Sequence, residues 1–267
     1  MDAEEDAHYK LKDSMDVLVT SQFNAASRIV KLTMLKWANE NVDNILEDVL
    51  KQPEWKSNSE ARLEVEENLR LEFYMATMQI CEDLIRAIES YRFSVKDPVK
   101  VFKSEIPATE FYSKVQEKNL TNTLLLDYLS LPSGPYSEDG KLPSILIESI
   151  GLFKEILLKT KDFYFKYKDL YNCYKHGNRF AVVVSGGIDD DPYWPAVIYL
   201  TKKGSRNTIH MIKLEKIDGA VAISKDIFKI VEIVKGNWIS RQLGTGEFKV
   251  TVPSRQKDTR NELSGKT

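Results

Sequence analysis

The feature that most constrains the fold of this chain is a seam of largely apolar and aromatic residues between positions 144 and 176. The seam advances by alternating steps of four and three residues, a spacing that keeps side chains on one face of an α-helix. Its members are Leu146, Ile150, Phe153, Leu157, Thr160, Tyr164, Tyr167, Tyr171 and Tyr174. We therefore predict a long helix from Ser144 to about His176 whose seam packs into a core. A second interpretation stays open for the tyrosine-rich half, which also suits a partly wet subunit interface.

The rest of the chain changes from helical to strand patterns. Helical periodicity covers 14–51 and a second stretch from Ser59 to the residues before Pro98, and 108–131 predicts one or two shorter helices with Thr109 as an N-cap. Short β-branched runs at 180–184, 195–201 and 208–214, separated by turn residues, predict an antiparallel meander. A last helix is expected from Ser224, as its N-cap, to about Leu243.

These patterns predict a mainly α fold, in which an N-terminal helical bundle carries a small antiparallel β-meander and a closing C-terminal helix. We expect residues 14–179 to form the bundle. Residues 180–252 are expected to form the meander and the last helix, packed on the bundle as one compact unit because no flexible linker separates the strands from Gly177. Residues 1–13 and 253–267 are polar and are expected to be flexible tails.

Composition narrows the class of protein. Hydrophobic residues make up 42% of the 267 residues, which is enough to build a core and excludes a disordered chain. The 38 basic and 40 acidic side chains give a net charge of −2, which argues against a protein that coats nucleic acid over its whole surface but leaves local patches open. No apolar run approaches the roughly 18 residues of a membrane span, and the acidic N-terminus does not resemble a secretory leader. We expect a cytoplasmic protein with no membrane partner.

Cysteine and histidine spacing gives no sign of a cofactor. Cys81 and Cys173 both fall in helical patterns, so we expect two buried thiols rather than a disulfide framework. No pair among the cysteines and the three histidines has metal-ligand spacing, and we therefore expect no metal and no other cofactor.

The segment richest in side chains that can bind or react is Tyr-Asn-Cys-Tyr-Lys-His-Gly-Asn-Arg at 171–179. Gly177 is placed to adopt the left-handed conformation that ends a helix. Helical spacing predicts one face made of Lys161, Lys168, Asn172, Lys175, His176 and Arg179. Between 159 and 179 six basic residues meet two acidic ones, a local charge of +4, whereas the segment 40–90 carries −8. The sequence therefore predicts a basic face at the end of one helix.

Such a face can serve RNA chemistry. The negative end of the helix dipole favours the protonated form of a histidine in the last turn, and Asn172 can hydrogen-bond the ring of His176. Lys175 and Arg179 would stabilise charge that develops on a phosphate. A histidine that acts as acid or base beside cations suffices for metal-free RNA cleavage through the 2′-hydroxyl. In the alternative interpretation, the cations only balance the helix dipole and satisfy its last carbonyl groups.

The string Asn-x-x-Lys-His-Gly at the end of a helical bundle resembles the signature of the HEPN superfamily. These helical domains carry an arginine, then a polar residue that is often asparagine, then a histidine a few residues on. Many are metal-independent ribonucleases of toxin–antitoxin, abortive-infection and other defence systems, and they usually act as dimers with a joint active site. The resemblance implies that Asn172 is the polar residue and His176 the catalytic histidine. Tyr171 stands where the motif has its arginine, so Lys175 or Arg179 would supply the cation.

Together these observations lead us to expect a HEPN-like RNA-binding protein or metal-independent endoribonuclease that forms a homodimer. His176 and Asn172 are the expected catalytic residues, and the expected RNA phosphate contacts are Lys175, Arg179, Lys168 and Lys161. The alternative is a non-catalytic interaction protein, in which the tyrosine seam and the basic face form a dimer or partner surface. A solvent-open groove around His176 would favour the first function, and a buried His176 bonded only to backbone would favour the second.

Overall fold

The computed structural model of the chain describes residues 25–48, 59–93, 106–131, 142–177, 180–185, 194–203, 206–243 and 253. It confirms the predicted fold class: a mainly helical protein with a three-stranded antiparallel sheet and a long C-terminal helix. In order, the elements are α2 (Ala25–Glu40), α3 (Val42–Asp48), α4 (Ser59–Phe93), α5 (Ala108–Lys114), the 3₁₀ turn η3 (Glu117–Asn119), α6 (Asn122–Tyr128), α7 (Ser144–Lys175), β1 (Phe180–Ser185), β2 (Trp194–Lys203), β3 (Arg206–Ile212) and α8 (Asp218–Leu243). In the part of the chain that is described, no helix has both the length and the apolar character needed to cross a bilayer.

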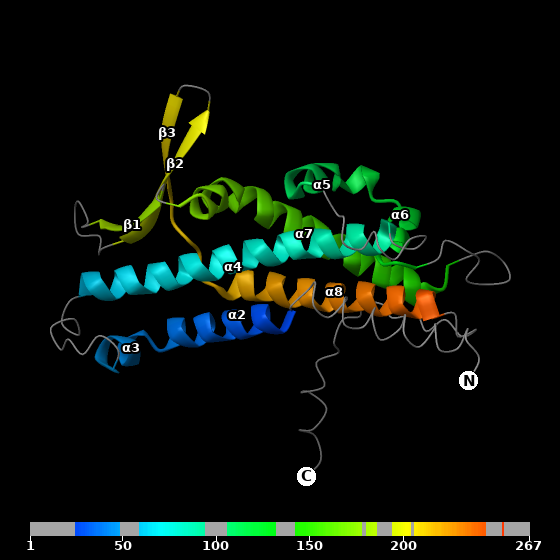
Figure 1. Ribbon diagram of the computed structural model, residues 1–267, viewed down its shortest axis with the longest axis horizontal. Helices are drawn as coiled ribbons and strands as arrows, with labels where there is room; N and C mark the ends of the chain where they lie inside the picture. The colour runs from blue at the N-terminus through cyan, green and yellow to red at the C-terminus, as the bar shows by residue number, and fades with distance from the viewer. Residues whose placement is uncertain are drawn as a thin grey trace, which may run out of the picture.

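Helix α4 is the centre of the molecule. It packs along both α2 and α8 and also contacts α7 and the sheet. Figure 1 shows α2, α4 and α8 side by side with their axes close to parallel, while α7 crosses behind α4 toward the sheet. The middle of α4 is buried around most of its circumference, including Met75, Met78, Cys81, Leu84 and Ile88. A helix that is apolar on several faces needs partners on several faces, which is why the other long helices surround it.

The seam of α7 lies in the core. Its members from Leu146 to Tyr171 are buried, and Tyr174 is partly exposed. The ring of Tyr167 lies 4.7 Å from the ring of Tyr74 on α4, and Tyr164 lies 4.8 Å from Tyr112 on α5. The core interpretation of the seam is therefore confirmed up to Tyr171, and Tyr164, Tyr167 and Tyr171 face the core rather than a subunit interface.

The meander is confirmed as a sheet of order β1-β2-β3, in which Phe180 pairs with Tyr199 and Tyr199 with His210. Because Phe180 is the first residue of β1, the end of β2 runs past the start of β1, and residues 200–202 lie beside the last turns of α7. One face of the sheet is open: Leu200, Ile209 and Met211 are 38%, 70% and 58% exposed. Figure 1 shows the β2–β3 hairpin projecting from the helices.

The helical pattern predicted over 14–51 is confirmed for the described residues, but as two helices, because the chain breaks between α2 and α3 at Asn41. The side-chain N–H of Asn41 donates to the carbonyl of Trp37 at 2.8 Å, and its own carbonyl accepts from Ile45 at 3.1 Å. An asparagine side chain that competes for backbone groups in this way ends one helix and begins the next. Residues 14–24 and 49–51 lie outside the described residues, as do the two predicted tails apart from residue 253.

The predicted N-caps Ser224 and Thr109 are wrong, because both residues lie inside helices. Helix α8 already begins at Asp218, and the buried hydroxyl of Ser224 lies 3.2 Å from that of Thr77 on α4. Helix α5 begins after Pro107, and the hydroxyl of Thr109 lies 3.3 Å from that of Tyr164 on α7. Each hydroxyl bonds to a neighbouring helix rather than to its own backbone, a choice that depends on tertiary packing.

From the central position of α4 we predict that truncating one of its buried side chains destabilises the fold. Leu84→Ala removes a fully buried side chain, and we expect it to lower the free energy of unfolding in urea by about 2–5 kcal/mol because a cavity remains. The matched control is Met34→Ala on α2, where the side chain is 65% exposed, and its effect is expected to stay within about 0.5 kcal/mol. Equal losses in the two variants would contradict the central role of α4.

Candidate functional site

The motif at 171–179 lies where α7 ends, as predicted. Lys175 is the last helical residue, His176 caps the helix, and Gly177 has a φ of +64°. The backbone N–H of Gly177 donates to the carbonyl of Tyr174 at 3.2 Å. This left-handed conformation is readily available to glycine, so the prediction for Gly177 is confirmed. It turns the chain out of α7 and leaves His176 at the junction between helix and sheet.

His176 is exposed and lines an open hollow of about 210 Å³ between α7 and β2. The other lining residues are Asp169, Asn172, Cys173, Leu200, Thr201 and Lys202. Asn172 and His176, one helical turn apart, thus face the same space. No hydrogen bond joins these two described side chains, so Asn172 does not orient the His176 ring in this structure.

Lys175 faces α4 instead of this hollow. Its Nζ lies 2.7 and 2.9 Å from the two carboxylate oxygens of Glu82. The hydroxyl of Tyr171 donates to the same carboxylate at 3.2 Å, and the Lys175 ammonium lies 4.3 Å from the centre of the Tyr171 ring. The Glu82 side chain is only 16% exposed, so it needs both donors. We call these three residues the Glu82 cluster; it makes Lys175 a structural cation.

The tyrosines of this helix end are held in their protonated form. Burial raises the pKa of Tyr171, and the neighbouring Glu82 carboxylate raises it further. Burial and a hydrogen bond to Glu72 at 2.6 Å raise the pKa of Tyr174 to about 12. Both phenols therefore act as donors that tie α7 to acids of α4. Position 171, where the HEPN motif has an arginine, faces the core in this chain.

Part of the predicted basic face, and a lysine beside it, is neutralised in space. Lys161 pairs with Asp162 at 3.6 Å, and Lys166 with Glu215, after β3, at 2.5 Å. Lys168 lies 5.1 Å from the centre of the Phe165 ring and pairs with no described acid. Arg179 lies outside the described residues. The charge of +4 counted along the sequence already includes Asp162. In space it is reduced further by Glu155 of the same helix, by Glu82 of α4 and by Glu215 after β3.

A second hollow separates the predicted cation from the predicted base. It has a volume of about 380 Å³, lies between α4, α5 and α7, and is lined by Lys175, Arg86, Glu82 and Thr109 among others. Asn172 borders this hollow as well as the first one. Lys175 and His176 therefore open to different spaces on the two sides of Asn172.

The cation beside His176 is Lys202, which the sequence analysis missed. It comes from β2 because the pairing of Phe180 with Tyr199 carries the following residues back along the end of α7. Its side chain is exposed, and it pairs with none of the described acids. The signal was present in the sequence: an antiparallel hairpin that starts just after a helix must return its second strand to that helix end.

Other groups around the hollow are fixed by hydrogen bonds. The Thr201 hydroxyl lies 2.8 Å from Nε2 of His210, whose ring stacks on Tyr199 with centroids 5.0 Å apart. The Cys173 thiol donates to the carbonyl of Leu200 at 3.0 Å, and both cysteines are buried as predicted. No group of three or more His, Cys, Asp or Glu side chains suited to a metal ion occurs among the described residues.

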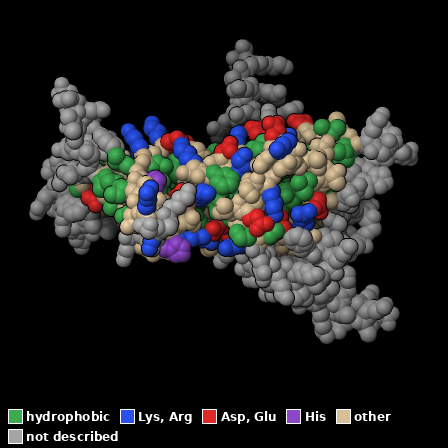
Figure 2. All heavy atoms as spheres, turned by 90° about the horizontal axis from the view of Figure 1, so that it is seen from above, with side chains coloured by type: hydrophobic (Ala, Val, Ile, Leu, Met, Phe, Trp, Pro, Cys, Tyr) green, Lys and Arg blue, Asp and Glu red, His purple; other side chains and the backbone are tan. Residues whose placement is uncertain are grey.

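Figure 2 shows lysine, arginine and histidine side chains mixed with apolar ones at the end of the molecule where the sheet lies. Comparisons of the chain with protein-family models, with curated proteins and with solved structures each found no match. Function must therefore be argued from the site.

The raised pKa of Tyr174 makes stability depend on alkaline pH. An unfolded tyrosine deprotonates near pH 10, whereas the fold holds the proton of Tyr174 up to about pH 12. The free energy of unfolding should therefore fall as the pH rises from about 10 toward about 12, because only the unfolded state gains from deprotonation there. In urea titrations over this range we expect Tyr174→Phe to lose stability less steeply than the wild type. Parallel pH slopes would refute this role of Tyr174.

Proposed function

We propose that the protein binds RNA at the end of α7 and that the hollow around His176 holds a phosphodiester group. The observation that carries this proposal is the exposure of His176 in an open hollow that Asn172 and Lys202 also line, with Asp169 as the one carboxylate among the lining residues. An imidazole, an amide and an ammonium group supply the hydrogen bonds and the positive charge that a phosphodiester requires. The same class of function is suggested by the resemblance of the motif to HEPN domains.

The proposed reaction is metal-independent cleavage of the RNA chain. His176 takes the proton of a ribose 2′-hydroxyl, and the 2′-oxygen attacks the adjacent phosphorus. A bond from the 2′-oxygen to phosphorus forms, the bond to the 5′-oxygen breaks, and the products are a 2′,3′-cyclic phosphate and a 5′-hydroxyl. Lys202 and the amide of Asn172 stabilise the charge that develops on the phosphate oxygens.

The leaving 5′-oxygen also needs a proton, and a second copy of the chain is the proposed source. In the HEPN domains that the motif resembles, two copies usually join their motifs in one site. A homodimer that brings two His176 side chains together would provide a base and an acid at once. The proposal therefore includes a dimer assembled around the ends of the two α7 helices and not through the buried tyrosine seam.

A non-catalytic interaction protein is the second candidate, and it rests on a different observation. The open face of the sheet places Leu200, Ile209 and Met211 side by side in solvent. Leu200 lies next to the His176 hollow, so an apolar partner surface would adjoin the same helix end. Exposed apolar side chains clustered in this way are typical of protein-binding faces.

Cleavage is tested with purified protein and total RNA in the presence of EDTA. We expect the wild type to cleave RNA and His176→Ala to be slower by about 10²-fold or more, because the acid–base group is gone. The matched control is Lys159→Ala on the same helix, where the lysine pairs with Glu155 at 2.7 Å away from the hollow; it should cleave like the wild type.

Each other outcome has a defined meaning. Equal decay with the wild type and with His176→Ala would refute the catalytic role, as would salt-dependent binding without any cleavage. The second result would leave the RNA-binding part of the proposal standing. If the protein neither binds nor degrades RNA, both parts of the proposal are refuted. The non-catalytic interaction protein is then the remaining candidate.

The two lysines near the motif should behave differently. Lys202→Ala is expected to weaken RNA binding and to reduce the slope of log affinity against log salt by about 0.7, because one phosphate contact is lost. Lys175→Ala should leave that slope unchanged and lower the free energy of unfolding by up to about 1 kcal/mol, since it removes a partner of Glu82. Filter binding across a salt series and urea unfolding check the two effects. A larger loss of RNA binding with Lys175→Ala would contradict the assignment of these two cations.

A further inference from the structure

A second candidate site lies away from the end of α7, in an open hollow of about 330 Å³ between α2, α4 and α8. Its walls are largely apolar and include Leu32 from α2, Phe73 from α4, and Val221 and Phe228 from α8. Leu32 and Phe73 belong to the buried core, so the floor of the hollow is a fixed surface. None of these residues takes part in the proposed RNA site.

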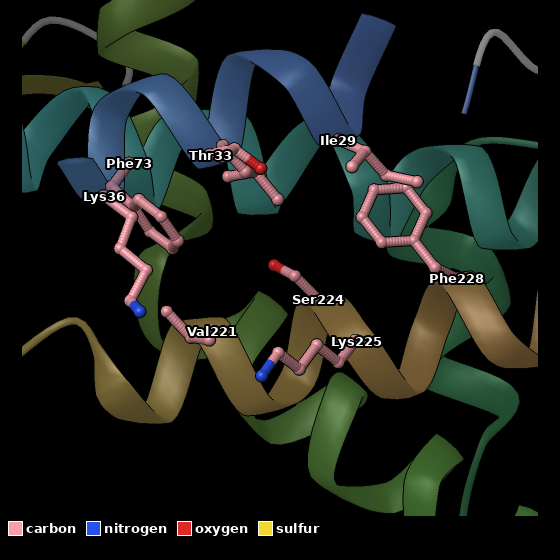
Figure 3. A pocket seen from close by; sticks show the side chains of 9 residues that line it. Ile29, Thr33, Lys36, Phe73, Val221, Ser224, Lys225 and Phe228 are labelled. Carbon is pink, nitrogen blue, oxygen red and sulfur yellow. The ribbon is translucent and has the colours of Figure 1, made fainter. Parts of the chain in front are cut away.

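The charged groups of the hollow lie at one end, whereas Thr33 and Ser224 contribute only hydroxyl groups. Figure 3 shows Lys36 of α2 and Lys225 of α8 extending toward the end where Val221 lies, whereas Ile29 and Phe228 close the other end. Lys225 pairs with no acid among the described residues, and Lys36 pairs only with Glu40, at 3.3 Å and half exposed to solvent. An exposed pair of this kind exchanges easily for another anion. Two ammonium groups are thus available at the same end of an apolar space.

The middle of the hollow favours an uncharged part of a ligand. The hydroxyl of Thr77 donates to the carbonyl of Phe73 at 3.0 Å, so in its 3.2 Å contact with Ser224 it must accept. The proton of Ser224 is therefore used, and its oxygen, which Figure 3 shows between the two helices, offers only lone pairs. Lone pairs repel an anion, and an anionic group is directed to the lysine end.

Volume sets the size of the ligand. An apolar cavity of roughly 150 Å³ holds one benzene ring, so about twice that volume suits a body of roughly ten carbons. We propose that this hollow binds a small amphiphilic carboxylate, whose apolar body lies between Phe73 and Phe228 and whose carboxylate meets Lys36 and Lys225. The site is independent of the proposed RNA function.

Isothermal titration calorimetry of the full chain with decanoate, below its micelle concentration, tests the proposal. Decanoate should bind about tenfold or more tightly than decylamine, which has the same chain and the opposite charge. Lys225→Ala should weaken decanoate binding by about threefold to fivefold, as expected for one exposed ion pair. Lys229→Ala, one turn further along α8 and outside the lining of the hollow, is the matched control and should bind like the wild type.

A filling variant separates the site from general surface binding. Val221→Phe places a ring in the hollow from a partly exposed position and should abolish decanoate binding while circular dichroism and thermal unfolding stay like those of the wild type. Equal affinity for decanoate and decylamine, unchanged binding in Val221→Phe, or no binding of decanoate would each overturn the proposal. If Val221→Phe does not fold, Ile29→Phe at the other end of the hollow serves the same purpose.

Discussion

The carboxylate of Glu82 holds the last turns of α7 against α4, and the other groups at this end of the molecule take their positions from it. The group is mostly buried and would be costly to leave without donors. Tyr171 and Lys175 supply them, and in doing so they fix the rotation of α7 about its own axis. Consecutive residues of a helix point about 100° apart, so turning Lys175 toward α4 turns His176 away from it, toward β2 and solvent. One interaction thus removes Lys175 from the site and exposes His176.

The tyrosine seam depends on the acids of α4 in the same way. Leucine would fill the seam as well as tyrosine does, but a buried phenol also needs a hydrogen-bond partner. Tyr171 finds Glu82, Tyr174 finds Glu72, and Tyr112 of α5 donates to the carbonyl of Cys81 at 2.9 Å. The acid-rich segment and the tyrosine- and lysine-rich segment lie far apart in the sequence and meet face to face in the fold. At the α4–α7 interface the described contacts between these segments are one ion pair, Lys175 with Glu82, and the phenol hydrogen bonds of Tyr171 and Tyr174.

The features that the sequence predicts correctly are those determined by residues close together in the chain. The start of α4 at Ser59, the end of α7 at Gly177 and the three strands depend on neighbouring residues, and all were found. The positions of Ser224 and Thr109 inside helices depend on hydroxyl partners that lie on other helices. The helical face at 161–179 was predicted from spacing alone. Spacing cannot show that Lys175 of that face pairs with Glu82 while His176 faces β2. Of the site residues that the sequence analysis missed, only Lys202 could have been predicted, from the register of the predicted hairpin.

The His176 hollow and the hollow between α2, α4 and α8 differ in character because different contacts create them. At the end of α7, a strand returns beside a helix terminus, and polar groups of both elements share an open space with Leu200 and Cys173. The hollow between α2 and α8 exists because both helices pack on α4 and have few contacts with each other. Two helices that lean on a common third leave a groove above it, floored here by Phe73 and edged by whichever side chains the helices turn inward. Because its floor belongs to the core, the groove has its shape before any ligand arrives. The cation of the His176 hollow, Lys202, comes from a hairpin that projects from the fold. The geometry of this hollow therefore depends on how firmly β2 is held against α7.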